Sequence, residues 1–157
     1  LIARIWNLVL ALLGTSALII SLWREATNEQ VASPLDGISF SLSYFTVWSN
    51  IFAFIVAWSL FANPRRDDKI FRWLRMTSLV MIVTTGLIYA AILAASADPC
   101  GPGIYTNAVF HYVVPWATLL LMLSSVSGKN TPWATFIRIK HNLREMRLWV
   151  IFLFISW

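Results

Sequence analysis

The chain is poor in charged residues and in cysteine. Of its 157 residues only 12% are charged, whereas 59% are hydrophobic and 15% are aromatic. A soluble domain carries roughly 25% charged residues, so this composition indicates a lipid environment. The single cysteine, Cys100, excludes an internal disulfide. The sequence also has only two histidines, far apart, and no glycine-rich phosphate loop. We therefore predict neither a metal nor any other cofactor.

Four uncharged stretches are long enough to cross a membrane. A transmembrane helix needs about 20 mainly apolar residues, and the stretches that provide them are 5–23, 40–61, 76–97 and 104–126. The last ten residues, Leu148–Trp157, are equally apolar but too short to cross. They either lie in the membrane interface or begin a fifth helix, and we favour the fifth helix because they have no polar face. The sequence therefore predicts an all-α, polytopic transmembrane bundle over residues 1–157, with four full spans and a partial fifth.

Basic residues are distributed unequally between the two sides of this bundle. Arg4 precedes the first span, five basic residues separate the second span from the third, and five more follow the fourth. Arg24 is the only lysine or arginine on the opposite side. The positive-inside rule then places the N-terminus in the cytoplasm. Because this distribution accounts for the net charge of +5, we expect a multi-pass protein of the cell membrane and no nucleic-acid partner.

Polar side chains recur along two of the predicted spans. Ser43, Thr46 and Asn50 follow the i, i+3, i+7 spacing of one helix face, and Asn107 and His111 share a face of the fourth span. Counted from the outer ends of their spans, Thr46 and His111 lie roughly 9 and 10 Å deep. Polar groups within a span avoid lipid. We therefore expect the two faces to meet, with Thr46 level with His111.

The same alignment places Asn50 level with Pro115. This proline lacks a backbone N–H and frees the carbonyl of His111, one turn back. Tyr89 on the third span is predicted to complete the wall of a small polar pocket. The simplest interpretation of these groups is hydrogen bonding between helices, worth about 0.6 kcal/mol each. His111 stands apart, since an ionisable side chain inside a span is a candidate functional residue.

A hydroxyl and an imidazole at one depth can act as nucleophile and base. A threonine hydroxyl attacks a carbonyl once a neighbouring base takes its proton, and His111 could be that base for Thr46. No carboxylate lies within the predicted spans to orient the imidazole. That role would fall to Asn50, Tyr89 or a backbone carbonyl, while Asn50 or Ser43 could donate to a developing oxyanion.

Two short motifs resemble those of a known family. "YFTVWSN" (Tyr44–Asn50) and "HYVVP" (His111–Pro115) are similar to the paired signatures of the androgen-induced and androgen-dependent TFPI-regulating membrane proteins, above all of their six-helix bacterial relatives. The resemblance covers the second to fourth spans. It implies a six-span bundle in which a membrane-embedded threonine and histidine hydrolyse lipid esters, in particular esters of fatty acids with hydroxy fatty acids. Carried over by position, Thr46 matches the nucleophile and His111 the base.

Two functions are therefore open. The first is a lipid-ester hydrolase of the membrane, with membrane lipid as its surroundings and a lipid ester as its substrate. The alternative is a non-catalytic membrane protein, either a bundle that binds or transports a small molecule or an assembly partner. The lack of carboxylates in the spans argues against ion-coupled transport, which usually needs acidic relays. The sequence carries no signal for an oligomeric state.

Cys100 provides a test of the predicted orientation. It lies in the third loop, on the side opposite the N-terminus, so we expect an impermeant thiol reagent to label it in intact cells. A variant with Cys100→Ser and Lys69→Cys should be labelled only after the cells are permeabilised, because position 69 belongs to the predicted cytoplasmic side. The reverse pattern would show that the bundle is inserted the other way round.

Overall fold

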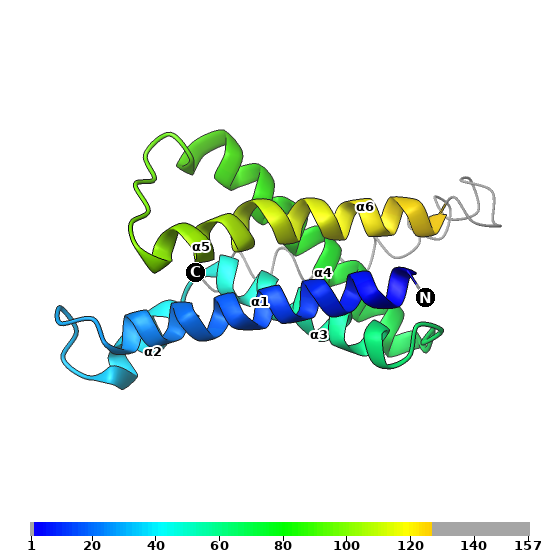
Figure 1. Cartoon of the computed structure of the whole chain (residues 1–157), viewed down its shortest axis with the longest axis horizontal. Coiled ribbons are helices and arrows are strands. Elements are labelled where there is room, and N and C mark those ends of the chain that lie inside the picture. Colours follow the sequence, from blue (N-terminus) through cyan, green and yellow to red (C-terminus); the bar gives the residue numbers. More distant parts are fainter. Residues whose placement is uncertain (1, 127–157) are drawn as a thin grey trace. The chain divides into compact units, whose positions relative to one another are not determined.

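The computed structural model describes residues 2–126, and these residues form helices and their connections, without a strand. The prediction for Leu148–Trp157 lies outside the described residues. Figure 1 shows long helices that run back and forth along one another. In chain order the elements are α1 (Ile2–Ala26), α2 (Pro34–Leu42), α3 (Phe45–Ala62), α4 (Lys69–Ile88), η1 (Tyr89–Leu93), α5 (Pro102–Ala108), η2 (Val109–Val113) and α6 (Val114–Val126).

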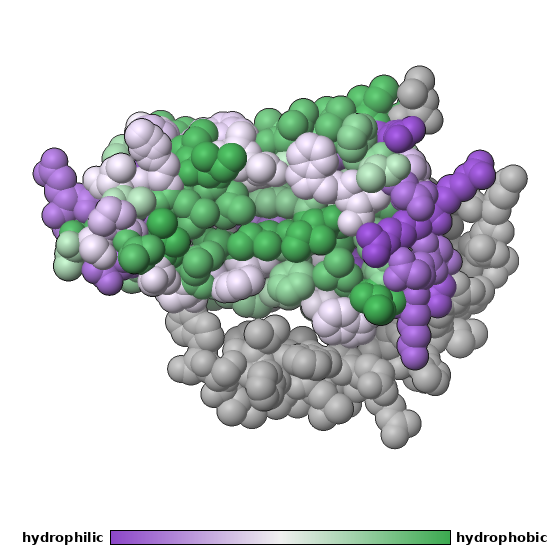
Figure 2. All heavy atoms as spheres, turned by 90° about the horizontal axis from the view of Figure 1, so that it is seen from below, coloured by the Kyte–Doolittle hydropathy of each residue, from purple (hydrophilic) through white to green (hydrophobic). Residues whose placement is uncertain are grey.

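Four of these helical segments are long and apolar enough to cross a membrane. The segments are Ile2–Ala26, Phe45–Ala62, Lys69–Leu93 and Pro102–Leu121. The third joins α4 to η1, and the fourth passes through α5, η2 and the start of α6 without a loop. Figure 2 shows hydrophobic residues along the middle of the bundle and hydrophilic residues at its ends. The predicted all-α class with four membrane-length helices is confirmed.

The chain divides into two compact units, residues 1–119 and residues 120–157. Within the first unit, α1 packs along α3, α3 packs along α4, and α5 with η2 packs against α1. Every residue of the candidate site belongs to this first unit. A single bundle over all 157 residues stays a prediction.

The second span begins later than the sequence suggested. Residues 40–42 belong to α2, and α3 starts only at Phe45, after Tyr44 in an extended conformation. Side chains supply donors to the carbonyls at this break. The Ser43 hydroxyl donates to the Phe40 carbonyl over 2.7 Å, and Nε1 of Trp48 donates to the Leu42 carbonyl over 2.7 Å. Backbone carbonyls that leave a helix in a membrane protein need such partners.

The first turn of α2 has a sequence signature of its own. The Ser33 hydroxyl accepts a hydrogen bond from the Asp36 N–H over 3.3 Å and donates to the Asp36 carboxylate over 2.8 Å. Pro34 occupies the first turn, where its missing N–H costs nothing. This reciprocal arrangement resembles a capping box, and it starts a separate short helix before the second span.

The third span is displaced toward the N-terminus relative to the prediction of 76–97. It begins at Lys69 because Asp68 caps α4, its carboxylate accepting from the Phe71 N–H over 2.9 Å. A hydrogen bond from Arg66, together with this one from Phe71, lowers the pKa of Asp68 below its ordinary value. The helix ends at Leu93, so residues 94–97 lie outside it.

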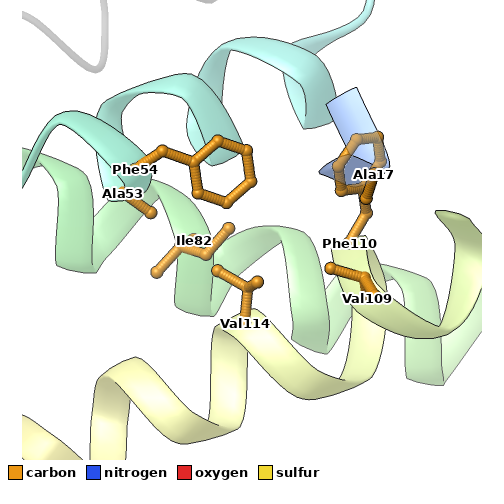
Figure 3. Close-up of a cluster of buried hydrophobic side chains, with 7 residues drawn as sticks. All are labelled: Ala17, Ala53, Phe54, Ile82, Val109, Phe110 and Val114. Atoms are coloured by element: carbon orange, nitrogen blue, oxygen red, sulfur yellow. The ribbon is translucent and has the colours of Figure 1, made fainter. Parts of the chain in front are cut away.

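The core joins helices that are far apart in the sequence. Buried side chains from α1, α3, α4, η2 and α6 point toward one another (Figure 3). They are Ala17, Ala53, Phe54, Ile82, Val109, Phe110 and Val114. The rings of Phe54 and Phe110 lie 6.4 Å apart between centroids, a separation within the favourable range for aromatic pairs. This contact brings η2 onto α3.

Two arginines connect the ends of neighbouring helices. Nε of Arg4 donates to the Phe61 carbonyl over 2.8 Å, so the start of α1 covers the end of α3. At the other end, the Arg24 guanidinium lies over Gly103, where a Cβ would come within 2.7 Å of Nη1. The N-terminus therefore shares one end of the bundle with the second loop, and the first loop shares the other end with the third. This pairing is the one that the charge distribution requires.

Gly14 on α1 allows Phe54 of α3 to pack closely, because a Cβ at position 14 would overlap the phenyl ring. We expect Gly14→Ala to lower the free energy of unfolding by roughly 1–3 kcal/mol through overpacking. In the double variant Gly14→Ala/Phe54→Leu the added methyl occupies space that the smaller side chain leaves. The loss of unfolding free energy in the double variant should therefore be smaller than the sum of the losses in the two single variants. SDS titration in detergent micelles measures these values. Additive costs would show that the two residues do not share this contact.

Candidate functional site

The third and fourth spans each contain a π-helical turn. In η1, the Ala94 N–H donates to the Tyr89 carbonyl over 2.8 Å, and in η2 the Val114 N–H donates to the Val109 carbonyl. Single π-helical turns inside α-helices are rare and occur frequently at functional sites. The aromatic residues Tyr89 and His111 belong to these two turns. The site is therefore centred where the regular α-helical pattern is interrupted.

Pro115 cannot donate a hydrogen bond to the η2 carbonyls one turn back, those of Phe110 and His111. In an α-helix the Phe110 carbonyl would accept from the Val114 N–H, but that N–H is bonded to Val109. In a π-helix its donor would be residue 115, and proline has no N–H. The Phe110 carbonyl therefore needs a donor from elsewhere, because an unpaired backbone group in a membrane core costs several kcal/mol.

Asn50 of α3 supplies that donor. Its Nδ2 donates to the Phe110 carbonyl over 3.4 Å and also to the Thr46 carbonyl over 2.8 Å. The side chain is fully buried. We call these two hydrogen bonds the Asn50 bridge. Through it, the backbone of Thr46 and the residue next to His111 lie within hydrogen-bond reach of the same nitrogen atom.

His111 lies flat against Tyr89. The ring centroids are 3.9 Å apart and the planes are inclined by only 15°. Tyr112 meets Tyr89 edge-on, with centroids 5.4 Å apart. Tyr89 is buried and His111 is half-buried. Stacking of this kind contributes about 0.5–1.5 kcal/mol beyond the buried area, so the imidazole has a defined resting position.

Gly86 permits the fourth span to approach α4 at the proline. A Cβ at position 86 would lie 2.8 Å from Cβ of Pro115 and 3.6 Å from the carbonyl oxygen of His111. Both Gly86 and Pro115 are buried. The turn that carries His111 is thus held on two sides, by Asn50 of α3 and by this contact with α4.

Two polar atoms of the site have no hydrogen-bond partner among residues 2–126. They are Oδ1 of Asn50 and Nδ1 of His111, and both atoms are buried. The described residues also place no hydrogen bond between the Thr46 hydroxyl and the His111 ring. The site therefore brings the backbones of Thr46 and Phe110 together, while the two candidate catalytic side chains remain unbonded to each other.

The Asn50 bridge gives the register of α3 against the fourth span. One nitrogen atom reaches the carbonyl oxygens of both Thr46 and Phe110, so these two carbonyls lie near the same level. The sequence expectation set Thr46 level with His111, which is one residue further along the fourth span. The Asn50 amide bonds to Phe110, because the carbonyl oxygen of this residue points along its helix toward Pro115.

The other predicted residues, Tyr89, Ser43 and Asn107, lie in three different surroundings. Tyr89 contacts His111, as its predicted place in the same wall required. Ser43 ends α2, where it is exposed and bonded to Phe40, so the prediction that it shares a helix face with Thr46 and Asn50 is wrong. Asn107 lies half-buried on α5. No hydrogen bond joins Asn107 to another of the described residues.

A second polar contact, between α3 and α4, was not predicted from the sequence. The hydroxyls of Ser49 and Thr85 lie 2.8 Å apart, and both side chains are buried. Each hydroxyl also lies within hydrogen-bond reach of a carbonyl of its own helix, that of Thr46 or Met81. The signal was available in the sequence, because Ser49 follows Thr46 by three residues and so lies on the same side of the helix.

Comparisons with known proteins provide no relative for this site. No family model matches the chain, and neither a curated protein nor a solved structure matches it. Within residues 2–126 no group of three or more histidine, cysteine or acidic side chains could hold a metal ion. The chemistry of the site must therefore be argued from its own side chains.

The buried serines of the bundle allow the Ser49–Thr85 contact to be measured. We expect a double-mutant cycle of Ser49→Ala and Thr85→Ala to give a coupling energy of about 0.6 kcal/mol, because one hydrogen bond between helices is lost. Ser78 is the matched control, since it is equally buried but its hydroxyl has no partner among the described residues. Ser78→Ala should leave the free energy of unfolding in detergent unchanged or raise it. A larger cost at Ser78 than at Ser49 would contradict this assignment.

Proposed function

We propose that the protein is an integral membrane lipid-ester hydrolase of the cell membrane, with Thr46 as nucleophile and His111 as base. The observation that carries the proposal is the Asn50 bridge, because it joins the backbone of Thr46 to the residue next to His111. An imidazole inside a membrane-length helix, held on a π-helical turn, supports a chemical role over a purely structural one. The resemblance of the two motifs to lipid-ester hydrolases points to the same pair.

The proposed reaction divides ester cleavage into two steps. In the first, the Thr46 hydroxyl oxygen attacks the ester carbonyl while Nε2 of His111 takes its proton. The tetrahedral intermediate collapses, the leaving alcohol receives that proton, and the acyl group remains on Thr46. In the second step His111 takes a proton from water, whose oxygen attacks the acyl carbonyl. The fatty acid is released and the Thr46 hydroxyl is restored.

The surroundings suit a lipid substrate. Exposed apolar side chains flank the start of α3, among them Phe40, Tyr44 and Trp48. Large apolar side chains that remain exposed at the end of a membrane-length helix are suited to contact with acyl chains. With the predicted orientation, an ester would reach Thr46 from the outer leaflet without leaving the lipid phase.

A non-catalytic bundle is the second candidate. It is favoured by the missing hydrogen bond between the Thr46 hydroxyl and the His111 ring within the described part of the chain. Catalytic hydrogen bonds are often long or absent before substrate binds, so this geometry is compatible with both functions. In the second candidate the buried polar groups would bind a small molecule or stabilise the contact between helices.

Hydrolysis by purified protein separates the two candidates. We expect turnover of a panel of lipid esters, including esters of fatty acids with hydroxy fatty acids. Thr46→Ala and His111→Ala should each lower kcat by about 10²–10⁴-fold, because the nucleophile or the base is removed. Thr46→Ser should retain activity, since it keeps a hydroxyl. Thr106→Ala is the control, because this buried threonine bonds within its own helix and to no other helix among residues 2–126.

Equal turnover by the wild-type protein, Thr46→Ala and His111→Ala would end the catalytic proposal. If turnover falls as far in Thr106→Ala as in Thr46→Ala and His111→Ala, the loss is due to unfolding. A parallel measurement of thermal stability in micelles detects such unfolding.

A further inference from the structure

We infer that Asn50 is a positioning residue, which fixes the place of the His111 ring by holding the backbone of the π-helical turn. This inference rests on the proposed function for its kinetic consequence only. Its structural consequence, the place of the imidazole against Tyr89, can be measured whether or not the protein hydrolyses esters.

The orientation of the Asn50 amide follows from its neighbours. Two carbonyl oxygens, of Thr46 and Phe110, lie within hydrogen-bond distance of the same side-chain atom. Only the NH₂ group of an asparagine can donate to two acceptors, whereas the amide oxygen donates to none. The atom between the carbonyls is therefore Nδ2, and both of its hydrogens are used. One of them crosses from α3 to η2.

The Phe110 carbonyl has two candidate donors, and the choice between them sets the helical pattern. Pairing with the Val114 N–H would close an α-helical turn, whereas Val114 in fact bonds to Val109. The amide of Asn50 supplies a partner that allows this alternative pattern. It thereby stabilises the π-helical turn at the expense of the α-helical one.

The position of His111 depends on whether this turn is π-helical or α-helical. A change from the π-helical to the α-helical pattern rotates the residues on one side of the turn relative to those on the other. Pro115 is held against Gly86 of α4, so the rotation would be taken up by the residues before it. Loss of the Asn50 bridge would therefore displace the His111 ring from Tyr89, even though Asn50 is bonded to the backbone of Phe110 and not to the imidazole.

Asn50→Ser removes the hydrogen bond to Phe110 and keeps one to Thr46. A serine at this position can still bond to the carbonyl of Thr46, four residues back, as serines in helices do. Its shorter side chain does not reach Phe110. Asn7→Ser is the matched control, because Asn7 is also buried and bonds four residues back, to Ala3. Within the described part of the chain it makes no hydrogen bond to another helix.

The measurement is the proton chemical shift of the His111 ring in micelles, in a His141→Gln background that leaves one imidazole. Stacking on Tyr89 moves these resonances upfield, and Tyr89→Leu calibrates the size of that displacement. We expect Asn50→Ser to move the His111 resonances downfield, toward their positions in Tyr89→Leu. Asn7→Ser should leave them at the wild-type position.

A second measurement is kinetic and uses the ester that the wild-type protein hydrolyses fastest. A base displaced by about 1 Å costs on the order of 10²-fold in rate, so Asn50→Ser should lower kcat by about that factor with little change in KM. If Thr46→Ala and His111→Ala leave hydrolysis unchanged, the proposed function fails, while the chemical shift still decides the role of Asn50.

An unchanged His111 chemical shift in Asn50→Ser would overturn the inference, whatever happens to activity. Asn50→Asp is the second variant, since it keeps the shape of the side chain but removes the NH₂ group, and it should shift the ring resonances in the same direction. If both variants fail to fold while Asn7→Ser folds, Asn50 is a structural residue and the inference is also wrong.

Discussion

Every backbone carbonyl that leaves the α-helical pattern inside this bundle needs a donor from somewhere else. In lipid no water replaces the lost partner, and each unpaired group costs several kcal/mol. Pro115 creates the most demanding case, because it removes the N–H that would serve a π-helical turn. The amide of Asn50 meets this requirement by reaching across from α3. This hydrogen bond joins the second span to the fourth beside the apolar contact of Phe54 with Phe110.

The same constraint explains the polar side chains at other interruptions. At the break between α2 and α3, Ser43 and Trp48 donate to carbonyls at the end of α2. At the end of α3, Arg4 donates to the carbonyls of Phe61 and Ala62. A basic group there also complements the negative end of the helix dipole. Many polar residues of this apolar chain are therefore accounted for by backbone carbonyls. Among residues 2–126, Nδ1 of His111 and the hydroxyls of Thr77 and Ser78 are buried without such a partner.

Length and hydropathy were sufficient to predict four membrane-length helices, because these properties are averages over many residues. Their limits depend on individual hydrogen bonds. Ser33 and Asp36 start a short helix whose capping pattern can be recognised in the sequence, yet the apolar run from Phe40 onward conceals where that helix ends. Composition gives no indication of a break that one extended residue, Tyr44, produces.

The π-helical turns lie beyond sequence reasoning for a different reason. Proline at position 115 predicts a freed carbonyl, but whether the helix continues as an α-helix or widens depends on which donor from another helix is available. That donor is Asn50, 65 residues away in the sequence, and only the packed helices show that its amide reaches the Phe110 carbonyl. A local signal and a long-range contact thus determine the turn together. The position of His111 is in this sense a property of the packed bundle, because the donor to the neighbouring carbonyl belongs to another helix.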